Sequence, residues 1–159
     1  LIESHGGELL VNLPTDHEIP VLKTFLLSNG FKRTSKFMTA IIRGVPRVHF
    51  NWIEACCNQS CFIDPSSFTN FLIEPPASCK PTGLLFKGKK FYPCGSAKFK
   101  NSWTSVLRLL GATVSINSNT NSNTICLAES SDDHQVKKNY EKVVNIDWLI
   151  KCIIERSFL

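Results

Sequence analysis

The stretch Val48-His49-Phe50-Asn51-Trp52-Ile53-Glu54-Ala55-Cys56 identifies the fold of this chain, because it recurs 96 residues later as Val144-Asn145-Ile146-Asp147-Trp148-Leu149-Ile150-Lys151-Cys152. Each copy is typical of a short apolar strand that turns into a helix, with a Trp in the first turn and a Cys four residues later on the same helix face. A spacing of 96 residues is too long for a solenoid repeat. It indicates two related domains in tandem.

The order of predicted elements in the second half indicates an α/β fold. Residues 84–92 alternate as a strand does, residues 102–110 suit a helix that ends at Gly111-Ala112, and residues 113–116 suit a strand. Further strands are predicted at 124–128 and 142–146, further helices at 131–140 and 148–156, and a polar loop at 117–123. Short apolar strands that alternate with helices predict a small parallel sheet with helices on both faces.

The first half shows the same order from its first helix onward. Residues 1–10 resemble a helix end that stops at Gly6-Gly7, with a strand at 8–12, so a further strand and most of this helix are expected before Leu1. Residues 21–27 suit a strand or a helix. The predicted helix at 37–43 has Thr34 as N-cap and Gly44 as stop, and a strand at 45–50 and a helix at 52–59 follow.

Dense prolines divide the two halves, because each proline removes a backbone donor and prevents a regular ladder. They predict a linker with one short helix near residues 66–72. The expected organisation is a first domain at 1–62, a linker at 63–83 and a second domain at 84–159.

The composition favours a soluble, intracellular protein with reduced thiols. No apolar run approaches the roughly 18 residues that span a membrane, and no signal-like segment opens the sequence. The odd count of seven cysteines, with no C-x-x-C pair and no His at ligand spacing, favours buried free thiols over metal or disulfide use. Free thiols fit a reducing compartment such as the cytosol or nucleus.

The net charge of +5 belongs wholly to the second half, where residues 81–159 carry eleven Lys/Arg and six Asp/Glu. Much of this excess lies in one basic run, formed by Lys87, Lys89, Lys90, Lys98 and Lys100. Such a run either forms a solvated face or attracts an anionic partner. The alternation at Lys87 and Lys89 predicts that both lie on one exposed face of a strand.

Three cations, Lys32, Arg33 and Lys36, surround the predicted start of the helix at 37–43. A helix N-terminus carries partial positive charge and unpaired N–H groups, so each cation there costs about 0.3–1 kcal/mol. A docked anion would reverse the sign of this cost, and a phosphate supplies both charge and acceptor oxygens. A solvated basic turn is the alternative reading.

Taken together, these motifs resemble BRCT domains in tandem over essentially the whole chain. Each half has a helix that ends in Gly-Gly or Gly-Ala, then strands, then a valine strand that leads into Trp-x-x-x-Cys. The pattern Arg33-Thr34-Ser35-Lys36 before Gly44-Val45-Pro46 is similar to the pattern in the C-terminal BRCT pair of fungal DNA-damage checkpoint mediators. The resemblance implies two units, each a small parallel four-stranded sheet flanked by helices.

The resemblance also implies a nuclear phosphopeptide-binding adaptor that docks a phosphoserine, with the phosphorylated C-terminal tail of a core histone at DNA breaks as the expected ligand. Lys36 matches the family's phosphate-binding Lys, and Thr34 and Lys32 are expected to support it. Arg33 matches the family's peptide-contacting Arg, and Met38, Lys98 and Phe99 are candidates for the groove between repeats. The hydroxyl partner of the phosphate would precede Leu1.

No catalytic, cofactor or metal signature occurs in the sequence, so we expect no enzyme. Two alternatives remain open. One is a pair that serves mainly homodimerisation or partner docking. The other is direct DNA binding through the basic run at 87–100. Chromatin association is expected for the leading hypothesis.

Overall fold

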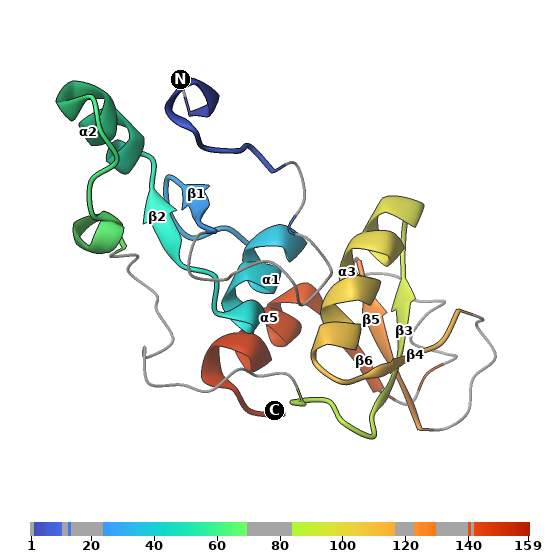
Figure 1. Cartoon of the computed structure of the whole chain (residues 1–159). Coiled ribbons are helices and arrows are strands. Elements are labelled where there is room, and N and C mark those ends of the chain that lie inside the picture. Colours follow the sequence, from blue (N-terminus) through green and yellow to red (C-terminus); the bar gives the residue numbers. More distant parts are fainter. Residues whose placement is uncertain are drawn as a thin grey trace. The chain divides into compact units, whose positions relative to one another are not determined.

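The computed structural model describes residues 2–10, 13, 24–69, 84–116, 123–129, 140 and 142–159. The chain divides into two compact units, Leu1–Ala77 and Ser78–Leu159 (Figure 1). The strands that pair do so in parallel, and helices alternate with them, which confirms the α/β prediction. In the described ranges no helix is both long and apolar enough to cross a bilayer.

In the first unit, two strands and two helices follow a short 3-10 turn. The turn η1 (Glu3–His5) ends at Gly6, whose left-handed φ of 81° stops it where the glycine pair predicted. Strand β1 (Leu26–Ser28) pairs with β2 (Arg47–His49), and α1 (Ser35–Arg43) and α2 (Asn51–Gln59) follow these strands along the chain. A further short helix, η3 (Pro65–Phe68), lies in the predicted linker. Residues 7–10 form no strand, and residues 11–12 lie outside the described part.

The second unit contains a four-stranded sheet in the order β4-β3-β5-β6. Its strands are β3 (Lys90–Cys94), β4 (Thr113–Val114), β5 (Thr124–Ala128) and β6 (Lys142–Asn145), and its helices are α3 (Ala97–Leu109) and α5 (Ile146–Glu155). Strand β5 lies between β3 and β6, and all five of its residues are buried, as expected for a central parallel strand. The predicted loop at 117–122 and most of the helix at 131–140 lie outside the described residues.

The structure corrects the start of this unit. Residues 84–88 form a turn rather than the first half of a strand, and Gly88 takes a left-handed φ of 77° there. Lys87 and Lys89 therefore precede β3 instead of alternating within it. The first helix also begins five residues earlier than predicted, because Ser96 caps it by accepting a hydrogen bond from the Phe99 N–H at 3.2 Å.

The repeated Trp motif closes both units in the same way. Trp52 Nε1–H donates to the Ile63 carbonyl at 2.9 Å, and Trp148 Nε1–H donates to the Leu159 carbonyl at 3.2 Å. Both acceptors lie eleven residues after their tryptophan. Each last helix ends at a left-handed residue with a φ of 54°, Ser60 or Arg156, so the 96-residue period holds for the backbone as well.

The surroundings of the two tryptophans differ. Trp52 is 6% exposed and packs with Val48 and Cys56 in the core of the first unit. Trp148 is half-buried and stacks on the fully buried ring of Phe86 at 6.0 Å. Trp52 is therefore a core residue of the first unit, whereas Trp148 lies at the margin of its core.

Candidate functional site

The start of α1 is positioned by the apolar face of the same helix. Phe37 and Ile41 are 2% and 4% exposed, and the Phe37 ring packs edge-on against Phe31 at 5.2 Å. This packing anchors the helix and leaves Lys36, one residue before Phe37, on the exposed side of the first turn. Lys36 thus lies at the start of a helix whose buried face holds it in position.

The predicted cap of α1 is present. Thr34 has an extended backbone, and its Oγ1 accepts a hydrogen bond from the Phe37 N–H at 3.3 Å. At the other end Gly44 adopts a φ of 68° and donates its N–H to the carbonyls of Ala40 and Ile41. Both ends of α1 are therefore fixed by the residues that the sequence indicated.

The structure brings the candidate phosphate ligands together around this helix start. Thr34, Lys36 and Lys32 are all exposed, as is Arg33, and no acidic residue lies in the first turn of α1. The first N–H groups of any helix lack an intrahelical acceptor and carry partial positive charge. With a hydroxyl and three cations beside them, this surface can attract an anion such as a phosphate.

The candidate peptide contacts separate into exposed and buried side chains. Lys98 is exposed in the first turn of α3 and does not precede the helix as predicted. Phe99, in the same turn, is 5% exposed and packs against Trp103 with ring centres 6.4 Å apart. Met38 is 0% exposed. The structure thus gives Met38 and Phe99 packing roles, and only Arg33 and Lys98 offer surface to a ligand.

The start of α3 carries a contact that the sequence did not reveal. Glu129, just after β5, accepts hydrogen bonds from the Ser96 N–H at 2.6 Å and from Ser96 Oγ at 3.0 Å. A carboxylate at this position suits the helix dipole. A Cβ at Gly95 would lie 2.5 Å from Glu129 Oε2, so the absence of a side chain there lets the carboxylate approach. The two residues are 33 positions apart, and no local pattern indicates their contact.

The starts of α1 and α3, which do not correspond to each other in the repeat, differ in charge. The start of α3 holds a carboxylate of its own chain, whereas the start of α1 holds a threonine cap beside exposed cations. The acidic stretch at 130–133, which precedes the second Trp motif in the sequence, lies outside the described residues.

Some of the described cysteines are buried, as predicted for free thiols, and others are exposed. Cys56, Cys126 and Cys152 are buried, Cys94 is half-buried, and Cys57 and Cys61 are exposed, contrary to the prediction. Burial raises the pKa of the Cys152 thiol above its usual value. No group of three potential ligands is close enough to hold a metal ion in the part of the chain that the structure describes.

Comparison with known proteins identifies the architecture. No family model matches the sequence. The structure aligns with the BRCT5–BRCT6 domains of Brc1 from S. pombe with a TM-score of 0.68 and 17% identity, over 99% of this chain and 86% of that one. It aligns with yeast Rtt107p, solved in complex with a phosphorylated histone, with a TM-score of 0.67 and 13% identity, over 98% and 78% of the two chains.

A third alignment, with the S. pombe Nbs1–Ctp1 complex, has a TM-score of 0.58 and 16% identity, over 85% of this chain and 47% of that one. The structures of Brc1 and Rtt107p match over nearly the full length of the present chain. The chain therefore has the fold of a tandem pair of BRCT domains, and this confirms the resemblance that its sequence motifs carry.

Proposed function

We propose that this chain is a phosphopeptide-binding adaptor module that docks a phosphoserine at the start of α1. The observation that carries the proposal is the gathering of exposed Lys32, Arg33 and Lys36 around the capping residue Thr34, in a chain with the tandem BRCT fold. No acidic residue lies in the first turn of α1.

Each residue has a separate role in this proposal. Lys36 supplies a point charge to the phosphate, and Lys32 adds to the positive potential. Thr34 Oγ1 accepts from the Phe37 N–H and keeps its hydroxyl hydrogen available for a phosphate oxygen. Arg33 suits a carboxylate of the peptide beyond the phosphoserine, because its planar guanidinium can form two parallel hydrogen bonds.

The proposed ligand is the phosphorylated C-terminal tail of a core histone at DNA breaks. Support comes from the sequence resemblance to checkpoint mediators and from the fold shared with Rtt107p, whose structure was solved with a phosphorylated histone. Lys98 remains a proposed second peptide contact, and Met38 and Phe99 would serve by holding their helices in place. The module would then act in the nucleus in the DNA-damage response, without catalytic activity of its own.

Fluorescence anisotropy with a labelled histone-tail peptide, phosphorylated and unphosphorylated, tests the proposal. We expect binding of the phosphorylated peptide only, and loss of at least about tenfold in affinity with Lys36→Gln, which is a change of about 1.4 kcal/mol. Lys151→Gln is a matched control, because it removes one exposed positive charge from α5, where Lys151 pairs with Glu155 at 3.8 Å. Equal binding of both peptides by the unaltered protein would refute the proposal.

A module used mainly for homodimerisation or partner docking predicts a different result. It would form a dimer in light scattering and bind its partner equally well with and without Lys36→Gln.

A further inference from the structure

A cluster of lysines and aromatic rings lies at one edge of the second unit. The ring of Phe158 has Lys89 Nζ 4.9 Å and Lys142 Nζ 4.6 Å from its centre. Lys142 Nζ is also 5.4 Å from the centre of the Trp148 ring. Such cation–π contacts hold an ammonium group over the ring while it remains exposed to a partner.

The topology explains why these lysines meet. All strands of a parallel sheet begin at the same edge, and Lys90 begins β3 while Lys142 begins β6. Lys87 and Lys89 belong to the segment that leads into β3. Two segments that are distant in the sequence thus place four lysines at the amino edge of the sheet, which we call the amino-edge cluster: Lys87, Lys89, Lys90 and Lys142.

The charge of the amino-edge cluster is not offset within the described part of the chain. Lys87, Lys89 and Lys142 are exposed and Lys90 is half-buried, and no described carboxylate forms an ion pair with any of them. Glu141, which precedes Lys142, lies outside the described residues. The contact of Glu129 with Ser96 lies at the opposite end of β5, where the strand has ended.

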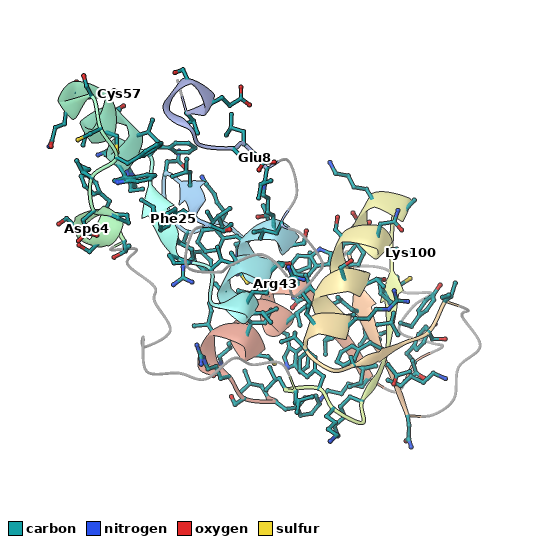
Figure 2. All side chains as sticks on the ribbon, viewed as in Figure 1. Glu8, Phe25, Arg43, Cys57, Asp64 and Lys100 are labelled. Atoms are coloured by element: carbon teal, nitrogen blue, oxygen red, sulfur yellow. The ribbon has the colours of Figure 1, made fainter. Side chains whose placement is uncertain are left out.

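The structure also divides the basic run that the sequence presented as one. Lys98 and Lys100 lie in the first turns of α3, which follows the carboxyl end of β3, and Lys100 Nζ is 5.8 Å from the centre of the Tyr92 ring. Figure 2 labels Lys100 on this helix. The backbone of α3 begins at the opposite end of β3 from Lys90, so the first turns of α3 carry these two lysines separately from the amino-edge cluster.

We propose that the amino-edge cluster is a docking surface for the phosphate backbone of duplex DNA, beyond the phosphopeptide site and independent of it. Lys89 Nζ and Lys142 Nζ lie 4.9 Å and 4.6 Å from the same ring centre, so both ammonium groups contact one side chain. Duplex DNA carries one charge per about 1.7 Å of its axis, so a surface formed by several lysines meets several phosphates.

The chemistry favours a nucleic-acid backbone over an acidic peptide. Lysine ammonium groups act as point charges and suit phosphate contacts without base readout. A duplex presents its charges on a rigid rod, whereas a flexible acidic peptide loses conformational entropy when it is ordered on the protein. The overall net charge of +5, carried by the second half, strengthens attraction of the polyanion.

Fluorescence anisotropy with a labelled duplex of arbitrary sequence, about two helical turns long, tests this inference. If each lysine of the cluster neutralises one phosphate, affinity should fall roughly 100-fold between about 50 and 200 mM salt. The double variant Lys89→Gln/Lys142→Gln should reduce the slope of log affinity against log salt by about two. Lys89→Arg/Lys142→Arg should retain binding, because it keeps both charges.

The matched control is Lys98→Gln/Lys100→Gln, which removes the same charge from α3 and also disrupts one cation–π pair. It should bind the duplex as the unaltered protein does, and so should Lys36→Gln. Equal losses in the two lysine-to-glutamine pairs would show a net-charge effect and overturn the proposal. It would also be overturned by absence of duplex binding at the lowest salt concentration, or by tighter binding of a poly-glutamate peptide than of the duplex.

Discussion

Thr34 allows the stability of α1 to be separated from anion binding at its start. Thr34→Ala removes the acceptor of the Phe37 N–H, and loss of such a cap costs about 1 kcal/mol. For a unit of this size that cost corresponds to a fall of about 4–8 °C in the melting temperature. Thr34→Ser keeps a hydroxyl at the same position and should restore both stability and binding.

Thr34→Asp is the decisive variant, because aspartate caps helices well but adds a negative charge. At about 6 Å from a doubly charged phosphate in water, that charge costs about 1.4 kcal/mol, or tenfold in affinity. We therefore expect unaltered melting by calorimetry together with about tenfold weaker binding of the phosphorylated peptide by anisotropy. If Thr34→Asp melts normally and binds the phosphorylated peptide as tightly as the unaltered protein, no phosphate docks beside Thr34.

Three further outcomes follow from contacts described above. Trp52→Ala should destabilise the first unit by roughly 3–5 kcal/mol, measured by urea unfolding, because the side chain is 6% exposed. Gly95→Ala should lower the melting temperature, measured by calorimetry, because its Cβ would lie 2.5 Å from Glu129 Oε2 and 2.6 Å from Glu129 Cβ, at a backbone φ of 153° that disfavours a side chain. Burial raises the pKa of Tyr140 to about 12, above its ordinary value of 10.0, so the stability linked to this group should be present below pH 10 and fall between pH 10 and 12. Tyr140→Phe should remove that part of the alkaline decline, followed by circular dichroism.

The sequence predicted the elements whose signals are local. The cap at Thr34 and the stop at Gly44 were both correct, because each depends on a single residue's hydrogen bond or backbone preference. The repeated Trp motif likewise located α2 and α5 to within two residues of their observed starts. Local chemistry was sufficient for these features.

The predictions that were wrong concern elements fixed by a distant interaction or by an ambiguous pattern. The apolar alternation at residues 84–92 suits a strand, but Gly88 turns the chain and Phe86 N–H bonds to the Leu110 carbonyl. The helix start at Ser96 was missed although its side chain is a common cap. The amino-edge cluster could not be anticipated, because only the sheet topology brings Lys142 to Lys89.

The hydrogen bond from Trp52 to Ile63 sets a practical limit on where the first unit can be cut. A fragment that ends at residue 62, the expected end of the first domain, would keep the tryptophan but lack the Ile63 carbonyl to which it donates. Ile63 and Phe68 also pack against the Val48–Trp52–Cys56 core, so a fragment must continue through η3 to retain that packing. Expression of an isolated first unit should therefore succeed only when residues 63–68 are included, because the start of the proline-rich segment packs on the core of this unit.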